Sequence, residues 1–598
     1  MASSSAADRA VRDALEAKSV QELWYILASV IGLLAFLRLA RVLLSNTPTV
    51  GRAETGELTE KGDAEQQSNS PTGKSSLRRL PNAIVAAFKI VAFRWSIPIG
   101  PQATMSVAEL TFILGYITVI FVREFVQTRD LSPTFWQDRA AHLASCQVPL
   151  IIALAGKNNI ISFLTGLNVL HRAAARTSFV LAWIHVISRT SRGLGARSDF
   201  SHNWMIAGAI ALVAFTLATF ISFRPIRNAA FEFFLISHIV LIAIFVICGY
   251  FHAREEGLVY LHRRTSSADV IYRSFGAYFW SGLVVWAADR VLRFCRILWN
   301  NRGGNATKAT VELLAEDTTR VTIRRRMNWT PGQHAYLIFP TVSKLPSEAH
   351  PFTIASIPTT IEGTNERELV FLIRGQGGFT RRLQQHVTSS SSEPVPVYID
   401  GPYGNPPNLH VFSTCILIAG GSGVSYTLGL FHDLVRNHSG KKSSVRRVVF
   451  VWAVRDGAHL TWITEIITKA LNVAPPSLSI EPRIYVTGPN YPIPKVPALQ
   501  SDGSTSSSTS SLPSDLTSQD LPQYSALKLS HGRPSMKKLL QDEINSALGP
   551  VSVDVAGPSA LSHSVRRVLA DVPASPSAAL KGTPDVTLHV ETFGMVKT

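Results

Sequence analysis

Four histidines form two matched pairs within apolar stretches of the chain. His171 and His185 are fourteen residues apart, and so are His238 and His252. On an α-helix this interval is about 1400° of rotation, which brings both rings to within roughly 40° of one face, ~21 Å apart along the axis. Imidazole is a natural axial ligand of heme iron, and two imidazoles on one iron suit electron transfer. Two such helices side by side would hold two hemes at two depths of a membrane.

The alternative is that the four histidines are unrelated residues of helix packing. A polar side chain inside a membrane span is expensive, however, and points to a functional site. The same interval on two separate stretches favours heme, because two stacked hemes divide a hydrocarbon gap of about 30 Å into shorter electron transfers. His142, His202 and His262 do not share the interval and stay outside the pattern.

A second group of residues suits a flavin. The string His350-Pro351-Phe352-Thr353 is followed closely by Ser356. A flavin needs an aromatic or apolar surface against its ring and hydroxyl groups for its polar atoms, and this string offers both. The sequence therefore predicts FAD-binding residues here.

A glycine-containing turn follows the flavin string. Arg374, Gly377, Gly378 and Thr380 supply a cation, backbone amides without crowding side chains, and a hydroxyl, which together suit a pyrophosphate. Each string alone is a weak signal, because a glycine-rich turn is usually only a turn. Their order along the chain favours one FAD site.

A second glycine-rich turn stands between a predicted strand and a predicted helix. It consists of Gly420, Gly421, Ser422 and Gly423. Glycines at such a junction let the backbone approach a ligand closely, and the following helix N-terminus favours a phosphate. The spacing is not that of the GxGxxG fingerprint, so the turn predicts nucleotide binding without predicting that fold.

Other residues complete the predicted nucleotide site. The next strand ends with Trp452 and Arg455, and Arg455 is placed to meet a 2′-phosphate, which favours NADPH over NADH; a plain surface arginine is the equal alternative. Gly557 and Pro558 follow another strand and would line the nicotinamide pocket. Phe593, close to the C-terminus, would lie against the flavin.

The elements that position these residues divide the 598-residue chain into an apolar half and a globular half. The first half contains about seven apolar runs near the twenty residues that cross a hydrocarbon core. The expected spans are residues 23–44, 105–126, 142–155, 160–187, 204–223, 230–251 and 276–298.

An odd number of spans places the two termini on opposite sides of the membrane. Because the C-terminal half is expected to bind nucleotides, it should be cytosolic, and the N-terminus should then lie outside. Residues 46–80 are polar and predict a loop or disordered linker. Residues 83–93 are apolar but too short to span, which favours an interfacial helix. The first twenty residues are too polar for the apolar core of a signal peptide.

The globular half changes pattern twice. Short strands at 311–314, 321–323, 369–373 and 395–399 predict a small antiparallel barrel. After Gly401 the order strand, glycine turn, helix, strand predicts a βαβ unit and a parallel sheet. Residues 501–531 are dominated by Ser and Thr and predict a disordered surface insertion.

Charge and cysteine content narrow the function classes. The net charge of +17 fits basic residues that flank membrane spans and bind anionic cofactors, and no nucleic-acid motif accompanies it. The four cysteines show no CxxC spacing, so the sequence supports neither a disulfide framework nor a zinc site.

These motifs together resemble the fungal ferric reductases, transmembrane metalloreductases related to the NADPH oxidases. The resemblance extends from about Val107 to the C-terminus. It implies that His171 and His238 ligate the heme nearer the cytosol and that His185 and His252 ligate the outer heme.

The resemblance also assigns the soluble residues. It implies an FAD barrel like that of the ferredoxin reductases, NADPH on the glycine turn and on Gly557 and Pro558, and Phe593 shielding the flavin until nicotinamide displaces it. One position departs from the family, which commonly has cysteine where this chain has Ala556. The departure puts the hydride-transfer rate or the nucleotide preference in question.

The expected fold is a multi-pass α-helical membrane domain with a di-heme bundle, followed by a cytosolic ferredoxin-reductase-like module. The module comprises an antiparallel β-barrel FAD domain and an α/β NADPH domain. The expected domains are an N-terminal span with a linker (1–104), the di-heme domain (105–300), the FAD domain (301–408) and the NADPH domain (409–598).

The expected activity is transfer of electrons from NADPH through FAD and two b-type hemes to ferric or cupric chelates or siderophores outside, for iron uptake. The expected partners are the lipid bilayer and an iron permease/oxidase pair, with no nucleic acid. The expected location is the plasma membrane, or else a vacuolar or other endomembrane. One alternative is a superoxide-generating NADPH oxidase, and a second is a non-redox transporter or channel with a regulatory domain.

Overall fold

The computed structural model describes most of the chain. The described residues are 6–45, 79–100, 103–126, 133–156, 168–191, 193–194, 199–261, 276–302, 308–315, 317–345, 348–389, 394–438, 443–488, 527–571 and 574–592. Several predicted features lie outside them: residues 46–78 of the linker, residues 160–167 of the fourth predicted span, residues 501–526 of the predicted insertion, and Phe593.

The described residues form two compact units. The first draws on residues within 1–67 and 107–296, and the second on residues within 68–106 and 297–595. The expected N-terminal region 1–104 is therefore not one unit, because its second part folds with the nucleotide-binding half of the chain.

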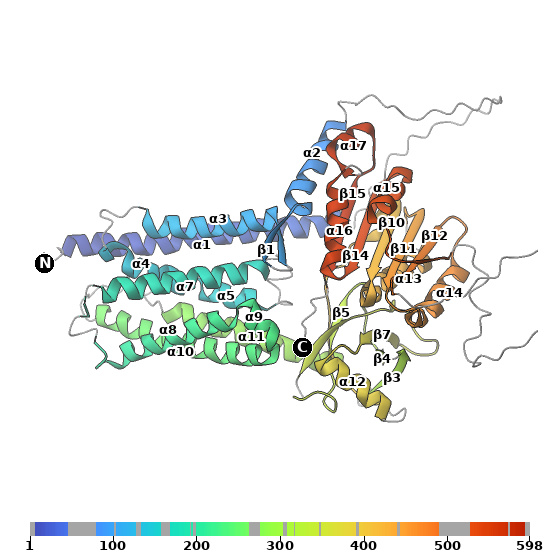
Figure 1. Ribbon diagram of the computed structural model, residues 1–598. Helices are drawn as coiled ribbons and strands as arrows, with labels where there is room; N and C mark the ends of the chain where they lie inside the picture. The colour runs from blue at the N-terminus through green and yellow to red at the C-terminus, as the bar shows by residue number, and fades with distance from the viewer. Residues whose placement is uncertain are drawn as a thin grey trace, which may run out of the picture. The chain divides into compact units, whose positions relative to one another are not determined.

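The first unit is entirely helical where it is described (Figure 1). Its helices form because long apolar stretches satisfy their own backbone hydrogen bonds. They are α1 (Ala6–Ser45), α3 (Val107–Phe125), α4 (Pro133–Cys146), α5 (Val148–Ala155), α7 (Asn168–Thr190), α8 (Asn203–Ile221), α9 (Arg224–Ala229), α10 (Phe231–Leu261) and most of α11 (Gly276–Asn300).

Within the described part of the chain, three stretches are long and apolar enough to cross a membrane. They are Leu15–Leu37, Asn203–Ile221 and Phe231–Arg254. Other helices are interrupted by charge, as α3 is by Glu109 and Glu124. The predicted count of about seven spans therefore stays a prediction.

The third predicted span needs a correction. Residues 142–155 are not one helix, because α4 ends at Cys146 and α5 begins at Val148. Pro149 stands in the first turn of α5, where it cannot donate the backbone hydrogen bond that would continue α4. Together α4 and α5 cover residues 133–155, which is long enough for one broken crossing.

The second unit begins its main body with an antiparallel barrel, as predicted. Two sheets of order β7-β4-β3-β8 and β6-β5-β9 enclose the core. The predicted strand 395–399 is divided into β8 and β9. The strands are β3 (Lys308–Ala315), β4 (Thr318–Arg325), β5 (His334–Ile338), β6 (Ala349–Thr353), β7 (Arg367–Arg374), β8 (Val395–Pro396) and β9 (Tyr398–Tyr403), with α12 (Gly378–Ser389) after β7.

A six-stranded parallel sheet follows, in the order β13-β12-β11-β10-β14-β15, and Figure 1 labels β10, β11, β12, β14 and β15. Its strands are β10 (Thr414–Gly420), β11 (Arg447–Val454), β12 (Ser479–Val486), β13 (Lys528–His531), β14 (Val551–Gly557) and β15 (Val586–Thr592). Strand β13 is a correction, because residues 528–531 were predicted to belong to the disordered insertion.

Both faces of this sheet are covered by helices, which is why its strands are apolar on both sides. Leu417 of β10 packs in the cluster shared with α13 (Val424–Arg436) and α14 (Thr464–Val473). Its neighbour Ile418 packs in the opposite cluster, with α15 (Met536–Ser546) and α16 (Ser559–Ala570).

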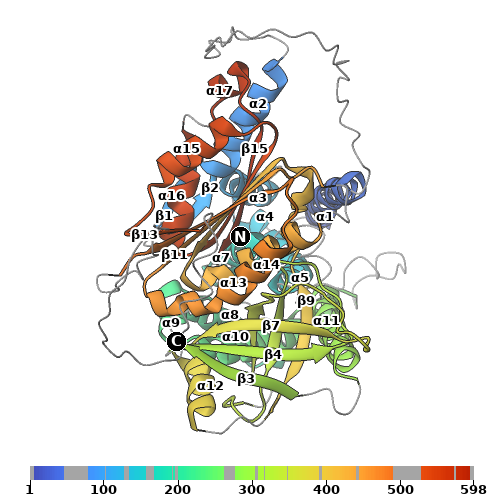
Figure 2. The ribbon, with the colours of Figure 1, turned by 90° about the vertical axis from the view of Figure 1, so that its right-hand side faces the viewer.

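A segment from the N-terminal part of the chain completes the second unit. It consists of α2 (Leu80–Lys89), the π-helical turn η2 (Ile90–Arg94) and the antiparallel pair β1 (Ser96–Gly100) and β2 (Ala103–Ser106). Helix α2 lies beside α17 (Pro576–Lys581) in both ribbon views (Figures 1 and 2).

Candidate functional site

The four predicted heme ligands share one local geometry. Each histidine Nδ1 lies within hydrogen-bond distance of a backbone carbonyl on an earlier helix of the first unit. The carbonyls belong to Ile151 for His171 (2.8 Å), Gln137 for His185 (2.8 Å), Ala218 for His238 (3.3 Å) and Trp204 for His252 (2.9 Å). A carbonyl oxygen only accepts, so each Nδ1 carries the proton and donates it.

The spacing of these bonds repeats. His171 and His238 each bond a carbonyl 20 residues earlier, and His185 and His252 each bond a carbonyl 48 residues earlier. The pairing of α7 with α4 and α5 thus has the same construction as the pairing of α10 with α8. Sequence reasoning found the histidines but missed the acceptors, because any residue type supplies a backbone carbonyl.

This arrangement fits heme ligation. A second bond that fixes one ring nitrogen sets the tautomer and the ring orientation, and leaves the lone pair on Nε2 for a metal. The ring of His252 packs closely against Gly208 of α8, since a Cβ there would lie 2.5 Å from His252 Nδ1. Among the residues described, no group of three or more His, Cys, Asp or Glu side chains could hold a bare metal ion.

Aromatic rings lie between the two histidine levels. Phe245 is seven residues from both His238 and His252, so it stands about 10 Å from each along α10. Its ring stacks on Phe215 of α8, with centroids 4.4 Å apart. Phe215 in turn contacts Phe179 of α7 edge to face, at 5.9 Å. The predicted hemes would therefore be separated by packed rings.

The flavin string forms strand β6 and the turn that follows it. The His350 ring stacks on Phe379 at the start of α12, with centroids 4.2 Å apart and planes 13° apart. Phe352 is half-buried and Thr353 is buried. Ser356 is turned toward β7, where its hydroxyl donates to the carbonyl of Glu368 and accepts from the amide of Val370. Ser356 therefore shapes the barrel in this structure.

A carboxylate holds His350 in place. Glu348 Oε1 lies 2.8 Å from His350 Nε2, and Glu348 Oε2 accepts from Arg382 of α12 at 3.2 Å. Burial alone raises the pKa of Glu348, but the bonds from His350 and the charge of Arg382 outweigh it, so the pKa is lowered. The ionised carboxylate thus joins β6 to α12.

The predicted pyrophosphate turn is preformed. The Thr380 hydroxyl accepts from the amides of Gln376 and Gly377, at 3.1 and 3.4 Å, and donates to the carbonyl of Gly377 at 2.9 Å. Gly378 adopts a φ of +48°, which is strained for residues with a side chain. A cavity of about 610 Å³ adjoins this turn along α12.

Arg374, the cation predicted for the pyrophosphate, is held by a carboxylate. Its Nε donates to Asp317 Oδ2 at 2.5 Å, and the other oxygen of Asp317 is 2.9 Å from His459 Nε2. His459 belongs to the turn η6 (Gly457–Trp462) after β11. The arginine therefore helps to join the barrel to the α/β sheet, a connection that no local sequence signal revealed.

The glycine turn and the late Gly-Pro meet at one point. Strand β10 lies between β11 and β14, and the chain turns in opposite directions on its two sides. A Cβ on Gly423 would lie 2.2 Å from the Ala556 carbonyl, and one on Gly557 would lie 3.0 Å from the backbone of Gly420. Nucleotides bind at such a switch point of a parallel sheet, outside its carboxyl edge.

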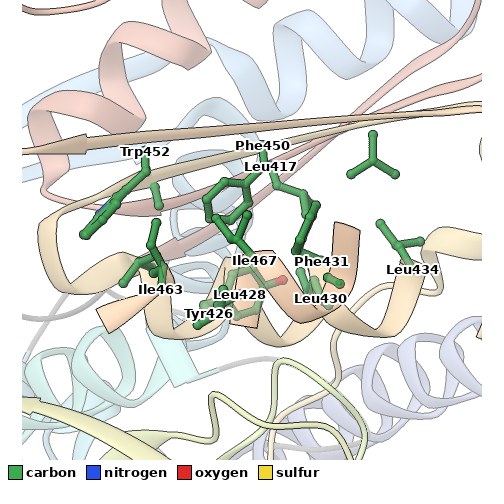
Figure 3. Packing of buried hydrophobic residues seen from close by; sticks show 14 of the residues in the cluster. Leu417, Tyr426, Leu428, Leu430, Phe431, Leu434, Phe450, Trp452, Ile463 and Ile467 are labelled. Carbon is green, nitrogen blue, oxygen red and sulfur yellow. The ribbon is translucent and has the colours of Figure 1, made fainter. Parts of the chain in front are cut away.

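Trp452 and Arg455, both predicted for the nucleotide site, differ in their exposure to solvent. Arg455 is exposed directly after the carboxyl end of the strand, as a 2′-phosphate ligand requires. Trp452 is fully buried, and its Nε1 donates to the Gly421 carbonyl at 3.0 Å. In Figure 3 the side chain of Trp452 points from β11 toward α13. Trp452 therefore braces the glycine turn from inside, in place of the predicted cofactor contact.

A buried carboxylate lies two residues before Ala556. Asp554 of β14 is fully buried, accepts from the Ser552 hydroxyl at 2.6 Å and faces His589 of β15 in the sheet register. Burial raises the pKa of Asp554 to about 6. Ala556 is itself fully buried, so the family's cysteine would replace a core methyl group here.

The three parts of the chain match three sequence families. Residues 140–249 match the family described as "Ferric reductase like transmembrane component", residues 304–407 match "FAD-binding domain", and residues 412–570 match "Ferric reductase NAD binding domain".

Curated relatives agree with these matches. A "Probable ferric reductase transmembrane component" of Candida albicans is 26% identical over 454 residues, covering 72% of this chain and 61% of the relative. "Ferric reductase transmembrane component 5" of Saccharomyces cerevisiae is 29% identical over 372 residues, covering 59% of this chain and 48% of the relative. The chain spans about half to three fifths of the length of such relatives.

Solved structures give a weaker likeness. A ferredoxin NADP+ reductase from Neisseria gonorrhoeae is 13% identical, covers 47% of this chain and 97% of its own, and has a TM-score of 0.30. The chain thus carries a ferric reductase transmembrane domain, an FAD-binding domain and a ferric reductase NAD-binding domain in succession, and its curated relatives are fungal ferric reductase transmembrane components.

Proposed function

We propose that this chain is a transmembrane ferric- and cupric-chelate reductase. Electrons would pass from cytosolic NADPH, by way of FAD and two b-type hemes, to metal chelates on the other side of the membrane. The observation that carries the proposal is the common geometry of the four histidines. All four donate Nδ1–H to a helix carbonyl, which leaves four Nε2 lone pairs at two levels.

The membrane residues would serve as heme ligands in pairs. His171 and His238 would hold one heme, and His185 and His252 the other. When bound, FAD takes two electrons as a hydride and releases them singly, and each heme carries one electron at a time. The chain's own part is to hold the rings rigidly, since four fixed imidazoles keep the iron environment unchanged between redox states.

The soluble residues would bind and orient the nucleotides. The amides of the turn at Gly377 and Gly378 would receive the FAD pyrophosphate, and Phe352 and Thr353 would meet the flavin ring. The turn at Gly420–Gly423 and the adjoining Gly557 would receive NADPH, and Arg455 its 2′-phosphate. Phe593, which directly follows β15, would cover the flavin until nicotinamide arrives.

The metal step needs no acid or base from the protein. One electron converts Fe(III) to Fe(II), which hard oxygen chelators hold less strongly, so the metal becomes available for uptake. The proposal includes about seven spans with the nucleotide-binding half in the cytosol, the plasma membrane as location, and an iron permease/oxidase pair as partners. The transmembrane, FAD and NADPH domains would have boundaries near 105–300, 301–408 and 409–598.

Heme content is the decisive test. The purified full-length protein should show a split Soret band, and His171→Ala should remove about half of it and abolish reductase activity. His202 is the matched control, because it lies in the same unit outside the fourteen-residue pattern and pairs with Asp199. His202→Ala should leave the spectrum intact. Protein with no cytochrome signal at all would exclude the proposal and favour a non-redox transporter or channel.

The acceptor needs a separate measurement. An NADPH oxidase would use the same cofactors and deliver the electron to oxygen. Reduction of an impermeant ferric chelate by intact cells, compared with superoxide release by the same cells, separates the two functions. Chelate reduction that is unaffected by superoxide dismutase supports the metalloreductase. Superoxide production by cells that do not reduce the chelate overturns the metal assignment.

A further inference from the structure

The segment α2–η2 has an unusual distribution of side chains. It buries Ala83, Ile90 and Ala92 against the second unit. Most of its large apolar residues are exposed. These exposed residues, which we call the outer face of α2 although they continue through η2 to Trp95, are Leu80 (47% exposed), Ile84 (60%), Val85 (46%), Phe88 (62%), Val91 (42%), Phe93 (53%) and Trp95 (53%).

The segment is fixed in this orientation by polar contacts. The buried guanidinium of Arg94 donates to the carbonyls of Leu569 and Val586, at 2.8 and 2.7 Å. Lys89 pairs with Asp585 at 2.7 Å, and Arg566 donates to the Phe93 carbonyl at 3.1 Å. The bonds reach α16 and the start of β15, so α2 cannot roll to bury its outer face without losing them.

A helix face made of large apolar residues is normally buried against an apolar partner. Side chains of the second unit cover the side that carries Ala83, Ile90 and Ala92. Exposed apolar patches that include aromatic residues mark protein or membrane contacts. The outer face therefore has an occupant in the working protein.

Chain connectivity identifies that occupant. In the β1–β2 pair Ser96 stands opposite Ser106, so the chain that leaves η2 returns beside it. Opposed residues of an antiparallel pair are about 5 Å apart. The next residue, Val107, begins α3, the second of the proposed spans. The segment thus ends at Trp95, beside a strand pair whose last residue directly precedes α3 in the chain.

Charge supports the same occupant. No acidic residue occurs from Leu77 to Ser106, whereas Arg78 and Arg79 directly precede α2. Trp and Phe at the apolar face with cations beside them are typical of helices that lie in the headgroup region of a bilayer. The cytosolic leaflet carries the anionic lipids that such cations attract.

We propose that the outer face of α2 is a membrane-docking surface, which inserts into the cytosolic leaflet and holds the β15 edge of the NADPH domain against the bilayer. The docking rests on the topology in the proposed function, in which α3 starts at the cytosolic surface. It commits to lipid as the occupant, and a second copy of the chain becomes a contrary outcome of the test.

Lipid photolabelling tests the proposal directly. The full-length protein is placed in phosphatidylcholine–phosphatidylserine nanodiscs that contain a phospholipid with a diazirine in its acyl chain. After irradiation, labelled peptides are mapped by mass spectrometry. We expect adducts on residues 80–95 at a yield within a few-fold of those on α8 and α10, which serve as the positive controls.

Matched variants identify the responsible residues. Ile84→Ser with Phe88→Ser should reduce labelling of the segment at least five-fold. Val473→Ser with Leu548→Ser, at positions that are 66% and 97% exposed in the same unit, should change nothing. Phe88→Trp should retain the labelling, which separates apolar character from ring size. Absence of adducts on wild-type 80–95 while α8 and α10 are labelled overturns the docking, and so does cross-linking of 80–95 to a second copy.

The heme spectrum of the same samples keeps the two proposals apart. An unlabelled segment in protein with an intact Soret band and reductase activity rejects the docking alone. A labelled segment in protein that never shows a heme band rejects the electron-transfer function and leaves the docking in place.

Discussion

The Asp317 carboxylate and the His459 ring are hydrogen-bonded at 2.9 Å, and this bond connects the barrel to the α/β sheet of the second unit. Asp317 precedes β4 and His459 follows β11, so 142 residues of chain separate the partners. Arg374 completes the group by donating to the second oxygen of Asp317. The carboxylate thus positions the cation predicted for the pyrophosphate.

Asp317→Asn should weaken this connection. Burial raises the pKa of Asp317, but the bonds from Arg374 and His459 outweigh it, so the pKa lies below its usual range. A lowered carboxyl pKa contributes stability above the unfolded value near 4, and the contribution is lost as the pH falls through the folded value. We expect a loss of about 1–3 kcal/mol at pH 7, measured by thermal unfolding in detergent.

The same variant has a defined pH signature. The difference between wild type and Asp317→Asn should shrink as the pH falls below 4. Asp542→Asn, on the exposed side of α15, is the surface control and should stay within about 0.5 kcal/mol of wild type. If the difference in stability between wild type and Asp317→Asn stayed constant down to pH 3, the charge of Asp317 would contribute nothing to stability.

Gly208→Ala should disturb the outer histidine pair. The added Cβ would lie 2.5 Å from the ring of His252, so the ring or the helix must shift. We expect a changed Soret splitting or a lower heme content, with the signal from the other pair preserved. Gly115→Ala in α3 has open space around its Cβ and should leave the spectrum unchanged. Equal spectra for both variants would show that the close packing of His252 on Gly208 does not affect heme binding.

Gly423→Ala should impair NADPH binding more than Gly421→Ala. At Gly423 the new Cβ would lie 2.2 Å from the Ala556 carbonyl, which pushes the two nucleotide turns apart. At Gly421 the space is open and only the φ of +55° is unfavourable, which costs about 1 kcal/mol. We expect at least a ten-fold higher KM for NADPH from the first substitution in steady-state assays. Similar KM values for the two variants would show that the contact is unimportant.

Arg455→Gln should change the choice of nucleotide. Loss of a charge-assisted bond to a 2′-phosphate costs about 1.5–3 kcal/mol, which raises the KM for NADPH roughly ten-fold or more and leaves NADH unaffected. Arg446→Gln, at an exposed site beside the amino end of β11, is the matched control. A parallel decline with both nucleotides would assign Arg455 a structural role.

Asp554→Asn should stabilise the protein at neutral pH. Because the folded pKa is about 6 and the unfolded value is near 3.8, the folded state binds more protons between these values. Stability therefore falls as the pH rises across this window, by about 3 kcal/mol in total. The variant should unfold at a higher temperature than wild type at pH 8 and at nearly the same temperature at pH 4. An unchanged midpoint at pH 8 would show that the carboxylate is better compensated than its burial indicates.

Periodicity and spacing placed several predicted site residues on the expected kinds of element. The fourteen-residue intervals placed both histidine pairs on α7 and α10, and the glycine turn at Gly420–Gly423 fell at the carboxyl end of β10 as predicted. The strands of the barrel and the parallel sheet followed from local alternation and from runs of buried β-branched residues. These signals are local, because they depend only on the repeat of the helix or strand.

Contacts between distant segments were not predictable in this way. The carbonyl partners of the histidines, the Asp317–His459 bond and the Arg94 bonds to α16 and β15 join residues that are 20 to 492 positions apart. Local patterns also did not reveal that Trp452 is fully buried or that Ser356 bonds to the neighbouring strand. Residue type does not show which way a side chain points once its strand is paired on both sides.

The sequence alone determined the kinds of element, the two histidine pairs and the resemblance to the ferric reductases, because hydrophobic period and motif spacing are properties of consecutive residues. Tertiary structure decided which ring nitrogen is bonded, which glycines touch and where the N-terminal segment packs. Those outcomes depend on packing and hydrogen bonding between elements far apart in the chain, where any backbone carbonyl serves as an acceptor and only the fold selects one.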